Sequence, residues 1–261
     1  MFTAISKDGT TLAYDKKGQG FPIILIDGAL CSRDMGPMPK LSAYLSQEFT
    51  VINYDRRGRN GSGDTAPYSV EKEIEDIDAL IKTAGGEADV FGISSGAVLA
   101  LAAASKGLAI RKLAIYEPPF SVDKSGHVPP KDSEAQLKKL IARNDRSGAV
   151  KFFMKDMVGL PAIVTYIMRI FPVWSKLKRV AHTLPYDAAV LGDGSMPSAM
   201  ISSIKIPTLV AGGEKSPAAL QSAVRAVAGI MPNHTSETLK GQTHNVSPKI
   251  LAPVLIDFFK N

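Results

Sequence analysis

The sequence predicts an α/β fold built around a mostly parallel sheet. Five short runs are almost continuously apolar, which is typical of strands covered on both faces. These runs are residues 22–28, 49–55, 88–94, 112–117 and 207–213. Segments with helical spacing of apolar residues lie between them. Because strands and helices alternate along the chain, we predict helices on both faces of one sheet.

The other segments of the chain predict an N-terminal hairpin, several helices and a last strand. Residues 2–17 predict two short strands, joined at Asp8-Gly9 by a tight hairpin turn. Helices are expected over residues 70–85, where Ile74, Ile77, Leu80 and Ile81 share one stripe, and over residues 96–105. Ser216-Pro217 and Ser247-Pro248 each place an N-cap residue before a proline at the first helical position, so one helix is predicted to begin at each site. A last strand is predicted between these two helices, at residues 234–241.

One long segment breaks the alternation. Residues 120–201 contain no buried-strand run, and residues 133–144, 149–158 and 161–184 have helical patterns instead. We therefore predict a core of residues 1–119 and 202–261, with residues 120–201 as a helical insertion. The aromatic and methionine side chains of the insertion are expected to pack on the core or to line an apolar pocket.

Composition narrows the class of protein. The only cysteine among the 261 residues is Cys31, so no intrachain disulfide is possible and a reducing, cytoplasmic compartment is expected. No signal-peptide pattern opens the chain, and no apolar run is long enough for a membrane span. The formal net charge of +6 is expected to be spread along the chain. Because its basic stretches lack the interleaved aromatics of a nucleic-acid binder, no nucleic-acid partner is expected.

The sequence Gly92-Ile93-Ser94-Ser95-Gly96 has G-x-S-x-G spacing at the junction of a predicted strand and helix. A sharp turn at such a junction exposes the central serine as a nucleophile, and the two glycines allow the close approach of backbone that the turn requires. Only Ser94 fits the spacing, so Ser95 is expected to contribute its backbone N–H, with its side chain incidental. The alternative is a glycine-serine turn without chemistry.

Three further motifs extend this pattern along nearly the whole chain. They are "LIDGALCSRDM" (25–35), "YDRRGRNGSGD" (54–64) and "LKGQTHNVSPKILAPVLIDFF" (239–259). With these motifs the chain resembles the α/β-hydrolase superfamily, although Asp27 stands where that family usually has histidine. The resemblance implies an eight-stranded, mostly parallel sheet with a helical cap inserted after the sixth strand. It also implies that the charged turn at residues 54–64 is mainly structural.

The resemblance and the chain order favour His244 as the general base, because it follows the last predicted strand. His127, His182 and His234 are interpreted as surface, cap and strand-edge residues, of which only His182 could face a substrate from the cap.

The oxyanion hole implied by the family combines the N–H of Ser95 with that of Ala29, or less favourably Leu30. Cys31, in the same loop, is interpreted as a small apolar filler rather than a reactive thiol.

The third catalytic group is not obvious. In the common family pattern it is an Asp after the seventh strand, but here that position holds Ser216, which cannot carry a charge and is expected to cap a helix. Glu117 ends the strand "AIYE" and is the preferred replacement, since some superfamily members take their acid from this place. Glu214 is the alternative acid, and a cap residue or no acid at all also stays open.

These residues predict a serine hydrolase of carboxylic esters, thioesters or lactones with a partly apolar small-molecule substrate. A carbon–carbon bond hydrolase or a cofactor-free perhydrolase on the same residues is the alternative, as is a non-enzymatic ligand receptor. No clustered metal ligands and no phosphate-binding glycine loop occur in the sequence, so neither a metal nor an organic cofactor is expected. The oligomeric state stays open.

Overall fold

A computed structural model describes residues 1–123 and 127–261. Its strands form one eight-stranded sheet in the order β1-β2-β4-β3-β5-β6-β7-β8. The strands are β1 (Phe2–Ile5), β2 (Thr11–Lys17), β3 (Pro22–Ile26), β4 (Thr50–Tyr54), β5 (Ala88–Ile93), β6 (Ile110–Tyr116), β7 (Thr208–Gly213) and β8 (His234–Leu239). Every predicted strand is therefore present.

Strand direction also follows the prediction. β1 pairs with β2, and β2 with β4, in antiparallel fashion, whereas all pairs from β4 to β8 are parallel. Parallel strands end at the same edge of a sheet. The loops that follow β3, β4, β5, β6, β7 and β8 therefore meet at one edge, which carries the predicted site residues.

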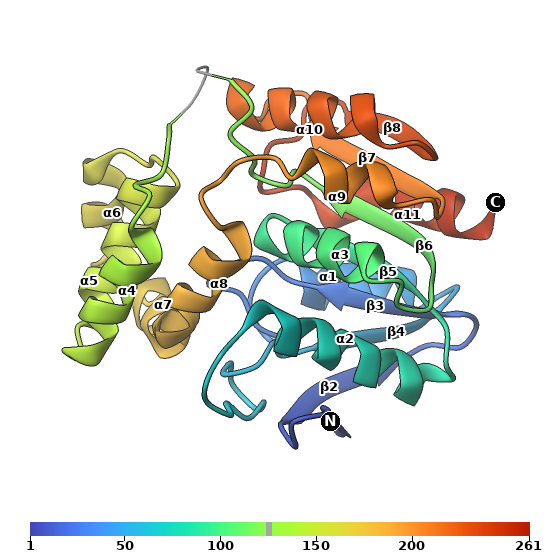
Figure 1. Ribbon diagram of the computed structural model, residues 1–261, viewed down its shortest axis with the longest axis horizontal. Helices are drawn as coiled ribbons and strands as arrows, with labels where there is room; N and C mark the ends of the chain where they lie inside the picture. Colours follow the sequence, from blue (N-terminus) through green and yellow to red (C-terminus); the bar gives the residue numbers. More distant parts are fainter. Residues whose placement is uncertain (124–126) are drawn as a thin grey trace.

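Helices cover both faces of the sheet (Figure 1). Contacts place α2, α3 and α10 on one face, while α1 packs with α11, behind the sheet in Figure 1. The helices outside the segment between β6 and β7 are α1 (Met38–Leu45), α2 (Val70–Ala84), α3 (Ser95–Ser105), α10 (Ala218–Ile230) and α11 (Pro248–Lys260).

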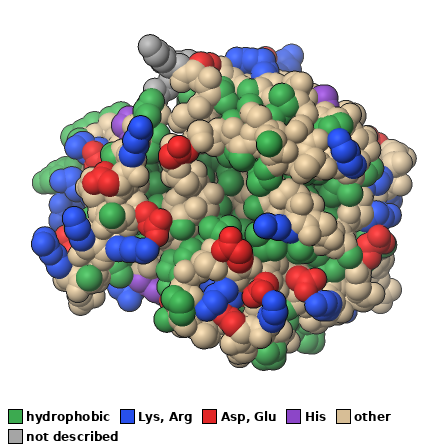
Figure 2. Space-filling model, viewed as in Figure 1, with side chains coloured by type: hydrophobic (Ala, Val, Ile, Leu, Met, Phe, Trp, Pro, Cys, Tyr) green, Lys and Arg blue, Asp and Glu red, His purple; other side chains and the backbone are tan. Residues whose placement is uncertain are grey.

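The segment between β6 and β7 is helical throughout its described regular structure. Its elements are α4 (Ser133–Ala142), α5 (Arg146–Phe152), a π-helical turn η1 (Phe153–Met157), α6 (Ala162–Met168), α7 (Val173–Val180), a 3-10 turn η2 (Ala181–Thr183), α8 (Leu184–Leu191) and α9 (Ser198–Ser203). Helices α4 to α7 stand to one side of the sheet, and Lys and Arg side chains are frequent over them (Figures 1 and 2). Helix α9 instead packs against α3 and α10.

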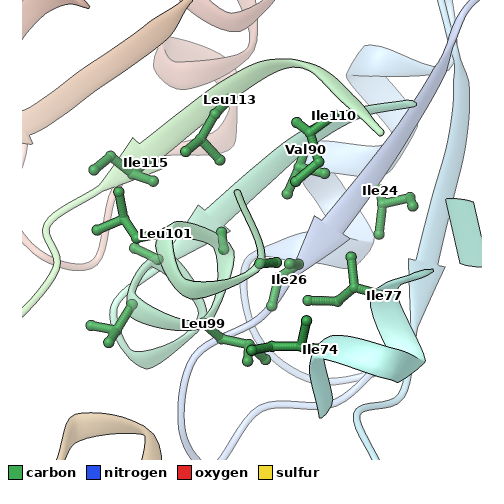
Figure 3. Close-up of a cluster of buried hydrophobic side chains, with 14 of the residues drawn as sticks. Ile24, Ile26, Ile74, Ile77, Val90, Leu99, Leu101, Ile110, Leu113 and Ile115 are labelled. Atoms are coloured by element: carbon green, nitrogen blue, oxygen red, sulfur yellow. The ribbon is translucent and has the colours of Figure 1, made fainter. Parts of the chain in front are cut away.

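Alternation along each strand divides the core between the two faces. In β3, Ile24 and Ile26 join the cluster under α2 and α3, whereas Ile23 and Leu25 join the cluster under α1 and α11. Figure 3 shows the first cluster, where Ile74 and Ile77 of α2 meet strand residues. A third cluster packs the helices between β6 and β7 together with Leu30. The sheet is thus buried on both sides, as the apolar runs predict.

The expected helix caps are wrong in detail. Helix α10 begins at Ala218 with Pro217 as its N-cap residue, and no side chain caps it, so Ser216 does not have the predicted role. Helix α11 does begin at Pro248, but the Ser247 side chain makes no capping hydrogen bond. Within the described residues, none of the helices has the length and apolar character needed to cross a membrane.

Candidate active site

Ser94 occupies the turn between β5 and α3. Its backbone has φ 57° and ψ −126°, a left-handed conformation that is costly for a residue with a side chain. The Ser94 N–H donates to the carbonyl of Tyr116 in β6 at 3.0 Å, which ties the turn to the neighbouring strand. The turn therefore holds Ser94 in a strained conformation at the carboxyl edge of the sheet.

The two glycines of the motif are required by packing. A Cβ on Gly92 would lie 2.5 Å from the carbonyl oxygen of Gly96, and a Cβ on Gly96 would overlap the carbonyl oxygen of Ile26. Both obstacles are backbone atoms, which cannot move aside as a flexible side chain can. Strand β3, strand β5 and helix α3 can therefore approach this closely only with glycine at both positions.

Glu117 and His244 come together although 127 residues separate them. The Nδ1 of His244 lies 2.8 Å from Oε2 of Glu117. The other carboxylate oxygen, Oε1, accepts a hydrogen bond from the Gly213 N–H at 2.6 Å. The Glu117 side chain is fully buried, whereas that of His244 is 40% exposed. This arrangement fixes the imidazole through Nδ1, while Nε2 has no hydrogen-bond partner among the described residues.

The alternative acid lies elsewhere. Oε2 of Glu214 accepts from the Gly241 N–H at 2.8 Å, and the pair is exposed. Within the described residues, no hydrogen bond joins Glu214 to His244, and none joins Ser94 Oγ to His244. The Ser94 hydroxyl lies beside Gly28, where an added Cβ would be 3.7 Å from Oγ. Among the acids considered from the sequence, Glu117 is therefore the one in contact with the imidazole.

Two backbone N–H groups near Ser94 lack acceptors. Within the described part of the chain, neither Ala29 N nor Ser95 N donates a hydrogen bond. Nη1 of Arg59 donates to the Gly28 carbonyl at 2.6 Å. Because that carbonyl and the Ala29 N–H belong to one planar trans peptide, Arg59 turns the Ala29 N–H to the opposite side.

A buried ion network lies directly beneath this loop. Arg56 pairs with Glu73 and with Asp187 of α8, both at 2.7 Å, and Arg59 pairs with Asp187 at 2.8 Å. The Ser95 hydroxyl also donates to Asp187 at 2.8 Å. The prediction that the Ser95 side chain is incidental is therefore wrong. Burial raises the pKa of Asp187, but the charges of Arg59 and Arg56 outweigh burial and hold that pKa below its usual value.

The charged turn after β4 is thus a salt-bridged scaffold, as predicted, but Arg56 also donates to the Ser95 hydroxyl and Arg59 to the Gly28 carbonyl. Asp187 was missed by sequence reasoning because it lies 92 residues from Ser95 in a segment interpreted only as apolar packing. Glu73 had a weak signal: an acidic residue beside the apolar stripe of α2 is buried here.

Asp27 is a second buried carboxyl group, 2% exposed, at the position where the family usually has histidine. Its Oδ1 accepts from the Gly28 N–H at 3.0 Å. Burial raises the pKa of Asp27 to about 7 despite the nearby Arg59 and Arg56. Burial, reinforced by Asp27, also raises the pKa of the Cys31 thiol well above its usual value. A protonated, inert thiol agrees with the interpretation of Cys31 as a filler.

We expect Asp27→Asn to stabilise the protein at pH 8 but not at pH 4. The unfolded chain releases the Asp27 proton near its ordinary pKa of about 3.9, whereas the folded protein holds it until about pH 7. Ionisation therefore favours unfolding increasingly as pH rises through this window. The gain should reach about 2 to 4 kcal/mol, since one pKa unit corresponds to about 1.4 kcal/mol. Urea unfolding at both pH values measures it.

Asp257→Asn, an exposed change in α11, is the matched control and should show no such pH dependence. An equal effect of Asp27→Asn at pH 4 and pH 8 would contradict the raised pKa.

The other histidines bind backbone carbonyls. Nε2 of His182 lies 2.7 Å from the Gly58 oxygen, Nε2 of His127 lies 2.6 Å from the Asp156 oxygen, and Nδ1 of His234 lies 2.7 Å from the Met231 oxygen. His182 is thus engaged with the loop after β4. Among residues 1–123 and 127–261, no group of three or more His, Cys, Asp or Glu side chains is arranged to hold a metal ion.

A model of the alpha/beta hydrolase family matches residues 28–249. The chain therefore belongs to this family and is an α/β hydrolase, which agrees with the resemblance drawn from its motifs.

Particular relatives agree with the family. An α/β hydrolase from Sphaerobacter thermophilus is 48% identical and has a TM-score of 0.93, covering 99% of this chain and 100% of that chain. A hydrolase from Pseudomonas aeruginosa shares the fold, with a TM-score of 0.75 at 20% identity, covering 100% of this chain and 98% of that chain. The uncharacterized hydrolase YraK of Bacillus subtilis is 34% identical over 97 residues, which are 36% of this chain and 35% of that protein. This chain thus matches about a third of the length of its curated relatives.

Proposed function

We propose that the protein hydrolyses carboxylic esters, thioesters or lactones through an acyl-enzyme on Ser94. The observation that carries the proposal is the Glu117–His244 hydrogen bond of 2.8 Å at the same sheet edge as the strained Ser94 turn. A serine becomes an effective nucleophile only when a base removes its proton, and an oriented imidazole is the usual base.

In the first half of the reaction, Ser94 Oγ attacks the carbonyl carbon while His244 Nε2 takes the hydroxyl proton. The Glu117 carboxylate accepts the Nδ1–H and stabilises the imidazolium that forms. The oxyanion accepts hydrogen bonds from the N–H groups of Ala29 and Ser95, whose unpaired state supports this role. Collapse of the tetrahedral intermediate breaks the bond to the leaving group, which receives the proton from His244.

In the second half, water replaces the leaving group. His244 takes a proton from the water as its oxygen attacks the acyl carbon, and the same N–H groups hold the new oxyanion. Breaking the bond to Ser94 Oγ releases the carboxylic acid, and His244 returns the proton to Ser94. The cycle thus uses the Ser94, His244 and Glu117 side chains, the two backbone N–H groups and water.

We also propose that residues 120–201 form a cap over the site of a core made of residues 1–119 and 202–261. In support, Ala29 and Leu30 pack with the apolar cluster of the helical segment, which contains Met154, Met157 and Trp174. An apolar wall beside the oxyanion loop suits an acyl or alcohol group that is apolar in part.

The proposal is tested by following nitrophenol release from p-nitrophenyl acetate and butyrate, with a parallel assay of peroxide-dependent bromide oxidation in acetate. Ester turnover well above the bromide reaction is expected. Stoichiometric binding of either ester without turnover would point to a receptor, and a dominant bromide reaction would point to a perhydrolase.

Arg59→Gln should lower kcat about tenfold to a hundredfold, because it frees the Gly28 peptide that orients one oxyanion donor. Loss of its buried pair with Asp187 should also cost about 3 to 5 kcal/mol of folding stability. Arg57→Gln is a matched control, since Arg57 is equally buried and pairs with Asp76 and Asp8 away from the loop.

Arg57→Gln should therefore lower the urea midpoint without a comparable loss of kcat. If both variants lost kcat in proportion to stability, Arg59 would have a purely structural role.

A further inference from the structure

Exposed hydrophobic side chains are concentrated in one short segment. Among the described residues, fourteen large hydrophobic side chains are exposed, and eight of them lie within residues 158–173. The most exposed are Ile170 at 77%, Tyr166 at 66% and Ile163 at 62%. We call the exposed hydrophobic residues of 158–173 the apolar patch. Single exposed hydrophobics are ordinary, but a contiguous group of this kind marks a binding surface.

Helix α6, at the centre of the apolar patch, has no charged residue in its sequence Ala162–Met168. Thr165 is its only buried residue, and the helix contacts the turn η1. A helix that is apolar all round is normally covered on all sides, by protein or by lipid. Here most of that surface has no cover within the described chain.

Positive charge is concentrated in the same region. Residues 131–183 contain eleven Lys and Arg but four Asp and Glu, a net charge of +7. Because the whole chain carries +6, the rest has a net charge of −1, and the expectation of evenly spread charge is wrong. Lys151, Arg169 and Lys176 are exposed and form no ion pair among the described residues.

One hollow joins the charge to the apolar patch. It has a volume of about 300 Å³ and is lined by Lys151 and Arg169 together with Ile163 and Tyr166. A second hollow, of about 520 Å³, shares Lys151 but contains no residue of the apolar patch, and its lining includes Asp132 and Asp156 beside further basic side chains. Lysine and arginine side chains are visible over this group of helices in Figure 2. Apolar side chains thus project between cations.

The positive charge of residues 131–183 indicates which kind of partner can cover the apolar patch. A second copy of this chain seated on the apolar patch would bring one segment of +7 against another, which electrostatic repulsion disfavours. A surface with anionic headgroups over an apolar interior satisfies both features, because it takes the cations at its headgroups and the apolar side chains beneath them.

From this combination we infer that residues 151–176 bind the surface of a membrane containing anionic lipids, with the apolar patch entering the headgroup region. The binding is peripheral and adds to the hydrolase activity rather than depending on it. An apolar substrate held in such a membrane would be delivered at the side of the molecule on which α4 to α7 lie.

The test is co-sedimentation of the full chain with vesicles of phosphatidylcholine, alone or mixed with phosphatidylglycerol. We expect binding to the mixed vesicles that weakens as salt rises. The triple variant Lys151→Gln, Arg169→Gln, Lys176→Gln should bind on the order of a hundredfold more weakly, since each basic residue near an anionic surface contributes about fivefold. Ile170→Asp combined with Phe171→Asp should abolish binding.

Matched controls carry the same changes elsewhere: Lys215→Gln, Lys240→Gln and Lys249→Gln for charge, and Ile250→Asp for an exposed hydrophobic residue. They should bind as the unaltered protein does. Equal sedimentation with both vesicle types, or unimpaired binding of the triple variant, would overturn the inference. So would a dimer in light scattering that Ile170→Asp and Phe171→Asp dissociate, because a second copy would then cover the patch.

Discussion

Ser94→Ala should lower kcat for p-nitrophenyl butyrate by about 10⁵-fold or more, the scale seen when a serine hydrolase loses its nucleophile. Alanine keeps the backbone of the turn but removes the only atom that can form the acyl-enzyme. KM should change little, because the binding surface is retained. Steady-state nitrophenol release, measured on protein purified free of host esterases, gives both constants.

Ser105→Ala is the control for this change. Ser105 ends the same helix, and its hydroxyl donates to the Ala102 carbonyl. Its kcat should stay within about twofold of the unaltered protein, since surface changes away from a site have small effects. Retention of more than a tenth of kcat in Ser94→Ala would exclude Ser94 as the nucleophile.

Glu117→Gln should lower kcat by about 10⁴-fold, as in other triads whose carboxylate becomes an amide. The amide oxygen can still accept from the Gly213 N–H, so the side chain should keep its place. Its NH₂ group then faces Nδ1 of His244, which favours the tautomer protonated at Nε2. In that tautomer the imidazole cannot accept the Ser94 proton.

Glu214→Gln makes the same chemical change in the alternative acid. The Glu214 carboxylate contacts Gly241 in an exposed loop, and the amide can preserve that hydrogen bond. We expect nearly unaltered kcat. A deep loss in Glu214→Gln with little loss in Glu117→Gln would reverse the assignment of the acid.

The fold was predictable because its signals are local. The parallel strands β3 to β7 are buried on both faces, so residues such as Ile23 and Ile24 must both be apolar although they point to opposite sides. The turn at Ser94 was predictable for a similar reason, since Gly92 and Gly96 are required by backbone contacts and leave a fixed spacing in the sequence.

The carboxylates that contact the site residues were harder to predict from the sequence. Glu117 could be named as a candidate from its position at a strand end, but only folding brings it to His244 across 127 residues. Asp187 contacts Arg56, Arg59 and Ser95 from a helix distant in sequence, and no local pattern distinguishes such a carboxylate from a solvent-exposed one. Long-range ion pairs depend on chain topology, which spacing alone does not define.

Acylation of Ser94 is tested by intact-protein and peptide mass spectrometry after rapid acid quenching of a reaction with p-nitrophenyl butyrate. We expect a protein heavier by one butyryl group, with the label on the peptide containing Ser94 and absent from Ser94→Ala. His244→Ala, in which attack and deacylation both lack their base, should acylate far more slowly. Ester turnover with no butyryl adduct, or an adduct on any residue other than Ser94, would contradict the acyl-enzyme on Ser94.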